Sequence, residues 1–262
     1  MVAATAREID VNHPISIAAT IYLSVIGAAV FIVQPGFVQG LVTLLGFDEQ
    51  QAGYVASIEV WGIAFTCVFL AMGGHRFSWQ GILSFSIILF FVGNIFSVFT
   101  SQITSFSLLR FVTGVGAGGL VGLTFTIIGL TRFADRNFGY LIMAVLTYGA
   151  LGLWAMPLLF DLIGLDGVLL LFALFGASGW WCLKWIPNSG QEQLQVEADA
   201  VDLGRVSRIV AVVAMFTYFF AQGVIWAYLF LIGVSGGVSE QGVANGLMVS
   251  QFFGIAGAMV PV

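Results

Sequence analysis

Long apolar runs separated by short polar segments extend over almost the whole chain. The runs predict eight membrane-crossing helices near residues 15–38, 53–73, 81–99, 105–130, 138–160, 165–187, 207–234 and 242–262. A helix needs roughly 20 apolar residues to cross a bilayer core, and the runs are close to that length. They lack the alternation of apolar and polar residues that marks a membrane β-strand. The pattern therefore predicts an all-α, polytopic membrane helix bundle.

The segments that join these runs are short, with one exception. Residues 188–206 form a polar, acidic stretch that is typical of a flexible connector. We expect it to divide the chain into an N-terminal six-helix bundle (1–187), a cytoplasmic central loop (188–206) and the first two helices of an incomplete C-terminal bundle (207–262). Because the last run is still apolar at Val262, we expect the intact protein to continue for roughly four more crossings.

The composition agrees with a membrane location. Hydrophobic residues make up 60% of the chain and charged residues 8%, against roughly 25% charged residues in a soluble domain. The lipid bilayer is therefore the expected surroundings, and we expect a monomer. The net charge of −5 gives no support to a nucleic-acid partner. Cys67 and Cys182 lie inside apolar runs, where packed free thiols are expected.

The distribution of basic residues predicts the orientation of the helices. Seven of the eight basic residues lie on the loops and helix ends that share a side with the N-terminus: Arg7, Arg76, Arg132, Arg136, Lys184, Arg205 and Arg208. Loops rich in Lys and Arg stay on the cytoplasmic side. We therefore expect an integral protein of the cell (inner) membrane with a cytoplasmic N-terminus.

Two charged residues lie well inside predicted crossings, away from the helix ends: Glu59 in the second and Arg110 in the fourth. An ionisable side chain inside the bilayer costs at least about 2.5 kcal/mol, so it needs a partner, a water-filled cavity or a function. Each residue lies about six residues, or about 9 Å, from the outer end of its predicted helix. This shared depth predicts a Glu59–Arg110 ion pair if the two helices are neighbours. The pair would couple transport, or alternatively would only brace the bundle.

Both charges lie on helix faces made of small residues. Helical spacing places Glu59 with Ala52, Ala56, Gly62 and Thr66, and places Arg110 with Gly114, Gly118 and Gly122. Small residues allow membrane helices to approach closely. We interpret the glycines as packing seams. In the first crossing, Pro35 and Gly36 either break the helix near its outer end, which would free backbone carbonyls, or simply end it, which is the alternative we favour.

The segment that begins at Arg110 resembles a known family motif. Residues 110–118 read Arg-Phe-Val-Thr-Gly-Val-Gly-Ala-Gly, similar to the fourth-helix motif Arg-x-x-Gln-Gly-x-Gly-Ala-Ala of the major facilitator superfamily, with Thr113 and Gly118 in place of Gln and Ala. Residues 71–80 resemble that family's loop signature between helices two and three. There Arg76 matches, whereas His75 stands where the family has Asp. The resemblance extends over the whole chain as six crossings, a polar loop and the start of a second half.

The resemblance implies alternating access around a central cavity lined chiefly by crossings one, four and seven, with parts of two, five and eight. Polar and aromatic residues on these helices are the candidates for substrate binding or coupling: Glu59, Arg110, Tyr22, Gln34, Thr113, Tyr148, Trp154, Tyr218, Gln222, Trp226, Asn245 and Gln251. The candidates for a gating loop are His75, Arg76, Arg132 and Arg136. Packing or interfacial anchoring remains the alternative for each binding candidate.

These observations predict a secondary active transporter of a small organic solute, and they leave coupling to protons open. The sequence shows no His and acid cluster at metal-ligand spacing, no phosphate-binding loop and no nucleophile motif. We therefore expect no cofactor, no metal site and no enzymatic activity. Two alternatives stay open: a non-transporting scaffold or sensor, and a membrane-embedded enzyme.

Overall fold

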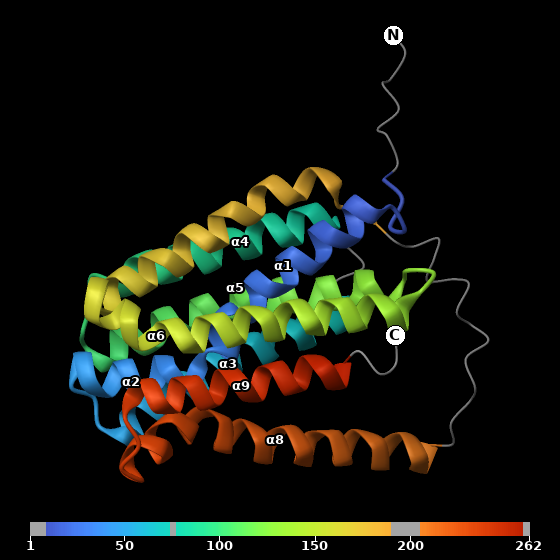
Figure 1. Ribbon diagram of the computed structural model, residues 1–262. Helices are drawn as coiled ribbons and strands as arrows, with labels where there is room; N and C mark the ends of the chain where they lie inside the picture. Colours follow the sequence, from blue (N-terminus) through green and yellow to red (C-terminus); the bar gives the residue numbers. More distant parts are fainter. Residues whose placement is uncertain (1–8, 74–76, 190–204, 259–262) are drawn as a thin grey trace.

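The computed structural model describes residues 9–73, 77–189 and 205–258, and the regular elements in these ranges are helices. They are α1 (Pro14–Ile32), α2 (Gln34–Leu45), α3 (Glu49–Gly73), α4 (Trp79–Ser97), α5 (Ile103–Gly129), α6 (Ala134–Ser178), the short 3-10 helix η2 (Gly179–Trp185), α8 (Arg205–Ser235) and α9 (Glu240–Ala258). The helices run side by side along one common direction (Figure 1). The prediction of an all-α helix bundle is confirmed.

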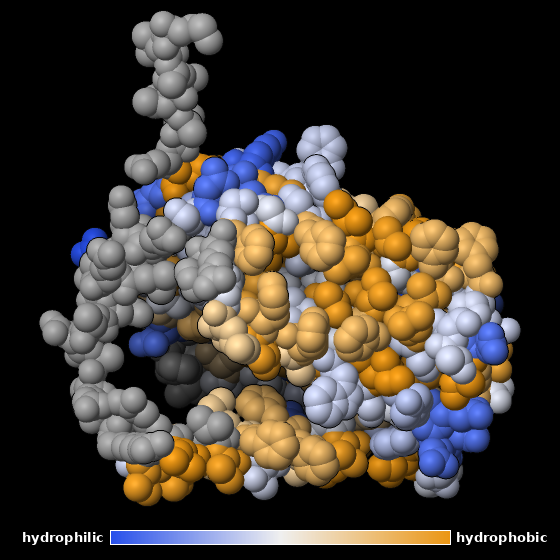
Figure 2. Space-filling view, turned by 180° about the vertical axis from the view of Figure 1, so that it is seen from behind, coloured by the Kyte–Doolittle hydropathy of each residue, from blue (hydrophilic) through white to orange (hydrophobic). Residues whose placement is uncertain are grey.

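The surface of the bundle is that of an integral membrane protein. By length and composition, six helical stretches of the described residues can cross a membrane, the longest of them being Ala134–Trp185. Large apolar side chains such as Phe65 (60% exposed), Met72 (79%) and Leu162 (80%) point outward. Figure 2 shows hydrophobic residues over the middle of the visible face and hydrophilic ones toward the helix ends. Lipid is the solvent that such a surface requires.

The first predicted crossing is interrupted rather than ended at its proline. α1 stops at Ile32, and α2 begins at Gln34 with Pro35 in its first turn. Proline lacks the N–H that an interior helix position donates, but it is accommodated at the start of a helix. Of the two alternatives for Pro35 and Gly36, the favoured one, that they end the helix, is therefore wrong, and the structure shows the other, a break. The crossing continues seven residues past the predicted end, as far as Leu45.

The fifth and sixth predicted crossings are two arms of one helical hairpin, α6. The arms meet at Gly164, whose dihedral angles (φ 66°, ψ −175°) depart from the helix. A positive φ of this kind is readily adopted by glycine. Because only this turn separates the arms, they fold back on one another directly. Figure 1 shows the hairpin at the end of the bundle that also holds the junction between α2 and α3.

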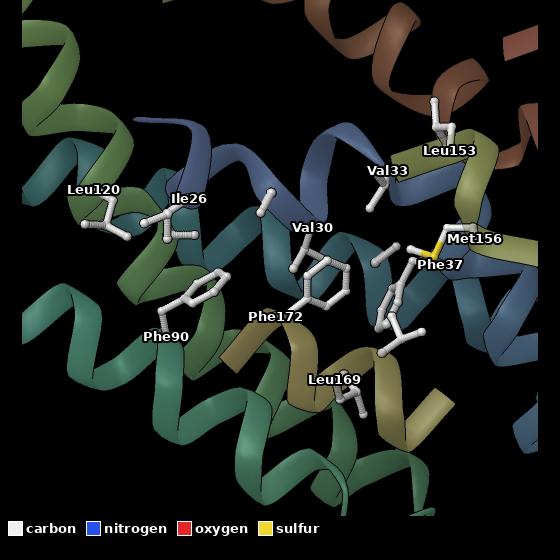
Figure 3. Close-up of a cluster of buried hydrophobic side chains, with 14 of the residues drawn as sticks. Ile26, Val30, Val33, Phe37, Phe90, Leu120, Leu153, Met156, Leu169 and Phe172 are labelled. Carbon is white, nitrogen blue, oxygen red and sulfur yellow. The ribbon is translucent and has the colours of Figure 1, made fainter. Parts of the chain in front are cut away.

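The hydrophobic core lies among α1 to α5 and both arms of α6, and it extends to Phe230 of α8 and to Val243 and Leu247 of α9. Figure 3 shows Ile26, Phe37, Phe90, Leu120 and Phe172 pointing into this region from different helices. All five side chains are at most 5% exposed. This core holds the first six crossings together.

Many hydroxyl groups in the helices are satisfied inside their own helix. Thr20 donates to the Ser16 carbonyl at 2.8 Å, and Thr124 donates to the Leu120 carbonyl at 2.7 Å. A hydrogen bond to the carbonyl four residues earlier removes the cost of placing a hydroxyl in lipid. Such residues need no ligand to explain them.

α9 packs along the first arm of α6. The Gln251 side chain lies against Gly149, and the Leu146 side chain lies against Gly254. Nearer the start of α9, Gln241 donates to the Trp154 carbonyl at 3.4 Å. This contact joins the helices that precede residues 188–206 to those that follow them.

Candidate functional site

α3 and α5 cross in backbone contact at the level of Glu59. A Cβ atom on Gly114 would collide with the Glu59 carbonyl oxygen, and one on Gly62 would collide with the Phe111 carbonyl oxygen. Only glycine fits positions where two backbones come this close. The predicted small-residue seam therefore forms between these two helices, and it brings Glu59 within one helical turn of Arg110.

Arg110 is fully buried, and its guanidinium group is held by α4. Nη1 donates to Asn94 Oδ1 at 3.1 Å, while Nη2 donates to the Gly93 carbonyl at 3.1 Å and to Ser97 Oγ at 2.7 Å. The group also lies 5.8 Å from the centre of the Phe37 ring and 5.5 Å from that of Phe106. A buried charge requires such partners. We call Gly93, Asn94 and Ser97 the α4 cradle.

Glu59 is only 5% exposed. No hydrogen bond or ion pair within the described ranges joins its carboxyl group to Arg110, whose own hydrogen bonds go to the α4 cradle. The expectation of a closed Glu59–Arg110 ion pair is therefore wrong for this conformation. The two residues nevertheless lie within about one helical turn of one another along the α3–α5 seam.

The separation of the two charges has a geometric cause. α3 begins at Glu49, four residues before its predicted start, which places Glu59 about 15 Å along the helix. Glu59 lies beside Gly114, which is four positions, or about 6 Å, beyond Arg110. The contacts pair Glu59 with Gly114 and Ile63 with Gly118, so α3 and α5 run in the same direction. In two helices that run in the same direction, side chains tilt toward the same end. The side chains of Glu59 and Arg110 therefore stay as far apart along the helix axes as their Cα atoms are.

Thr113 and Gln34 also lie inside the helix bundle. Thr113 is fully buried and donates to the Leu109 carbonyl at 2.9 Å, and its hydroxyl fills the space where Gly93 lacks a side chain. Gln34 is 6% exposed and donates to the Ala56 carbonyl on α3 at 3.5 Å. Thr113 thus fits the packing of α4 against α5.

One face of α8 borders a groove of about 460 Å³. Its lining includes the predicted candidates Tyr218, Gln222 and Trp226, together with Thr217 and Ile225. The structure therefore brings together the three candidates of the seventh crossing. The lining mixes apolar bulk with one amide and one phenol, as small-molecule sites do.

α8 meets the first six crossings near its C-terminal end. Trp226 Nε1 donates to the Phe31 carbonyl at 3.3 Å, and the Tyr228 hydroxyl donates to the Glu49 carbonyl at 3.3 Å. Phe230 is 1% exposed, whereas Val210 and Phe216 are 60% and 70% exposed. Figure 2 shows a hollow between α8, along the lower edge, and the rest of the molecule. α8 is therefore packed near its C-terminal end and exposed in its N-terminal half.

Tyr22 and Tyr148 belong to an aromatic cluster at the second arm of α6. Phe175 stacks on Tyr148 with ring centres 5.3 Å apart, and it meets Tyr22 edge-on at 5.7 Å. The Tyr22 hydroxyl is 2.7 Å from Ser178 Oγ. Tyr148 and Phe175 also line an apolar pocket of about 290 Å³ with Val33. These tyrosines are therefore apart from the α8 groove.

Three further candidates lie where α6 and α9 meet. Gln251 is 7% exposed, and its Oε1 atom has no hydrogen-bond partner. Asn245 accepts a hydrogen bond from Gln241 at 3.1 Å, and the same Gln241 amide donates to the Trp154 carbonyl. The Trp154 side chain is 41% exposed.

Two of the four gating-loop candidates, His75 and Arg76, lie outside the described residues. The other two flank one aromatic ring between α5 and α6. The guanidinium groups of Arg132 and Arg136 are 5.3 Å and 4.6 Å from the centre of the Phe133 ring. The Arg132 backbone N–H donates to Asn12 Oδ1 at 2.7 Å, which ties this loop to the segment before α1.

Sequence reasoning missed two polar contacts. It did not single out Asn94 and Ser97, although an Asn in the third crossing is as unusual a polar residue as the glutamines that were chosen. It also missed Gln39 of α2, which is 4% exposed and donates to Glu240 Oε1 of α9 at 2.9 Å. The proximity of positions 39 and 240 has no signal in the sequence.

Comparisons with known proteins give structural neighbours and no sequence relatives. No protein-family model matches the chain, and no curated protein matches it. Among solved structures, the xylose transporter XylE from E. coli in an inward-open conformation matches with a TM-score of 0.68 at 13% identity. A D-xylose-proton symporter matches with a TM-score of 0.69 at 16% identity. Each match covers 92% of this chain and 66% of the neighbour, so the chain spans just under two thirds of their length.

These matches define the class of the molecule. The chain is an integral membrane protein built as a bundle of apolar helices. More particularly, it shares the fold of these two transporters. The resemblance at Arg110–Gly118 is thus matched by the arrangement of the helices.

Proposed function

We propose that this protein is a secondary active transporter that moves a small organic solute by alternating access. The observation that carries the proposal is the α8 groove, whose lining residues all belong to α8 and include Tyr218, Gln222 and Trp226. Of these, Trp226 also donates to the Phe31 carbonyl of the first crossing. Its volume of about 460 Å³ suits a small molecule. The neighbours' names, a xylose transporter and a D-xylose-proton symporter, support a small organic solute and coupling to protons.

Solute counterflow tests this proposal directly. We expect the full-length gene product in proteoliposomes to exchange a labelled solute, identified by a screen of metabolites for thermal stabilisation, against an unlabelled internal pool. Gln222→Ala should weaken that exchange, because an amide in an apolar groove is suited to hydrogen-bond a bound solute. A protein that folds and binds solutes but shows no exchange would be a scaffold or sensor instead.

We also propose that Glu59 is the residue at which protons couple to transport. A carboxyl group that is 5% exposed inside the bilayer without a hydrogen-bond partner in the described chain is costly to keep for packing alone. Glu59→Gln keeps the shape of the side chain and removes the titratable group. We expect this variant to exchange solute but to lose accumulation driven by an imposed pH gradient. Accumulation that still follows the gradient as in the wild type would exclude Glu59 as the coupling site.

The proposed location is the inner membrane with the N-terminus in the cytoplasm, and the proposed state is a monomer. The moving parts are the six-helix bundle of residues 1–187 and the bundle that begins with α8 and α9. The orientation rests on the basic residues, which include Arg132, Arg136 and Lys184. Cysteines placed at residues 102 and 236 should react with an impermeant thiol reagent from outside, whereas a cysteine at 134 should react only from the cytoplasm. The reverse pattern would invert the proposed orientation.

A further inference from the structure

The two ionisable side chains at the α3–α5 crossing, Glu59 and Arg110, are unequally partnered. Arg110 has hydrogen bonds to three uncharged acceptors of the α4 cradle, with donor–acceptor distances of 3.1, 3.1 and 2.7 Å. Its Nε atom has no partner. Glu59, although close by, makes no hydrogen bond to it in the described structure. A carboxylate is a stronger acceptor for a guanidinium group than an amide or a hydroxyl. The α4 cradle therefore occupies the guanidinium group of Arg110 although the carboxylate of Glu59 would be a stronger acceptor.

On the basis of the proton coupling proposed above, we propose that Asn94 and Ser97 are positioning residues that compete with Glu59 for Arg110. In the described conformation they hold the guanidinium group on α4. In the other state of the transport cycle, Arg110 turns to Glu59.

The surroundings of Arg110 suit an exchange between two partners. The guanidinium group lies near the Phe37 and Phe106 rings, which attract a cation from either position. The offset of about 6 Å between Arg110 and the level of Glu59 is one turn of helix. An arginine side chain, with its long stem, can bridge that offset by changing rotamers. The α4 cradle and Glu59 thus provide two alternative positions for one charge.

Each position of Arg110 sets a different charge on Glu59. A guanidinium group beside a carboxyl group favours the ionised form, and its withdrawal in an apolar environment favours the neutral acid. Glu59 therefore carries a proton while Arg110 is in the cradle and releases it when Arg110 arrives. The proton is taken from water on one side and returned to water on the other, and no other covalent bond changes.

Few other groups compete for this role. α2 and α4 carry no titratable side chain, and α5 carries only Arg110. On α3, the other titratable residues are Glu49, Tyr54 and Cys67. Of these, Glu49 is at the start of the helix, and Cys67 lies against the Gly118 carbonyl two turns beyond Glu59. Tyr228 of α8 lies over Gly53.

The test follows the proton itself, so no substrate is needed. Infrared difference spectra of the full-length protein in lipid, recorded during a pH titration, should contain a protonated-carboxyl band that Glu59→Gln removes. Asn94→Ala and Ser97→Ala should move the midpoint of that band by about one pH unit toward acid, since Arg110 then spends more time at Glu59. Asn94→Asp should move it toward alkali, because the added carboxylate holds Arg110 in the cradle.

Ser84→Ala is the matched control, because Ser84 is also on α4 but bonds the Gln80 carbonyl of its own helix at 2.6 Å. It should leave the midpoint unchanged. If the alanine variants do not fold, Asn94→Asp and Ser97→Thr carry the test, with an alkaline shift expected in the first and a wild-type midpoint in the second. Midpoints that coincide in wild type and Asn94→Asp would overturn the positioning role. A wild-type spectrum with no band removed by Glu59→Gln would instead overturn the coupling role of Glu59.

Discussion

Arg110→Ala should sharply lower the yield of folded protein and abolish transport. The substitution removes the only donor that the structure gives to Asn94 Oδ1 among the described residues. It also removes one hydrogen bond each from Ser97 Oγ and from the Gly93 carbonyl, which keep the 2.7 Å bond from the Ser97 hydroxyl to that carbonyl. In addition, it removes the cation that Glu59 is proposed to meet in the other state of the transport cycle. Removing one partner of a buried charge network typically costs about 3–5 kcal/mol. Because natural proteins are stable by only about 5–15 kcal/mol, this is a large fraction of the total. The yield of monodisperse protein in detergent and its thermal midpoint measure the loss.

Two further variants separate the causes of that loss. Arg110→Lys keeps the charge but loses the planar fork, so its stability should fall between wild type and Arg110→Ala. Lys184→Ala removes an exposed cation that stacks on Trp185 at a helix end, and it should unfold at the wild-type temperature. If Arg110→Ala unfolds at the same temperature as Lys184→Ala, the α4 cradle does not stabilise the bundle.

Joining α2 to α9 should stop transport completely and reversibly. Gln39 of α2 and Glu240 of α9 are linked by a hydrogen bond of 2.9 Å between their side-chain ends. Alternating access requires the two bundles to separate at each end in turn. Cysteines at both positions, in a protein whose Cys67 and Cys182 are replaced by alanine, should be bridged by a reducible bifunctional thiol reagent. Uptake should fall to background and return when the bridge is reduced.

A bridging reagent is needed because a direct disulfide requires Cβ atoms about 3.5–4.5 Å apart, whereas two long side chains separate these positions. The matched control is a bridge between Gln80 and Asn188, which are neighbours within the first six crossings, as the 2.9 Å hydrogen bond from the Trp79 N–H to the Asn188 carbonyl shows. That bridge should leave uptake unchanged. Full activity with positions 39 and 240 bridged would exclude separation of the bundles at this end.

The apolar runs predicted most of the fold because each membrane helix satisfies its own backbone and needs about 20 apolar residues. Helix ends were less accurate, since polar residues such as Gln39 and Glu49 remain helical where the helices extend beyond the apolar runs. Periodicity also located the α3–α5 seam. It could not reveal that Pro35 begins a new helix, because a proline near the end of an apolar run fits either a stop or a restart.

The partners of the buried charges were harder to predict than the charges themselves. Glu59 and Arg110 stand out because ionisable residues are rare inside apolar runs. Which acceptors surround a guanidinium group depends on the axial offset between helices, and an offset of one turn moved Arg110 from Glu59 to Asn94. Tyr218, Gln222 and Trp226 were recognised together because helical spacing alone places them on one face. Their groove on α8 depends on the position of a whole helix, which spacing does not give.

The backbone contact between α3 and α5 limits how the protein can move. Where side chains interdigitate, two helices can slide by small steps as rotamers change, which is the usual basis of shear motion. At Gly62 and Gly114, carbonyl groups of one helix face the backbone of the other, and no side chain is present to change its rotamer. α3 and α5 are therefore expected to move together as one rigid body. The displacement that exposes the groove to either side must then be carried by hinges elsewhere, such as the interruption between α1 and α2.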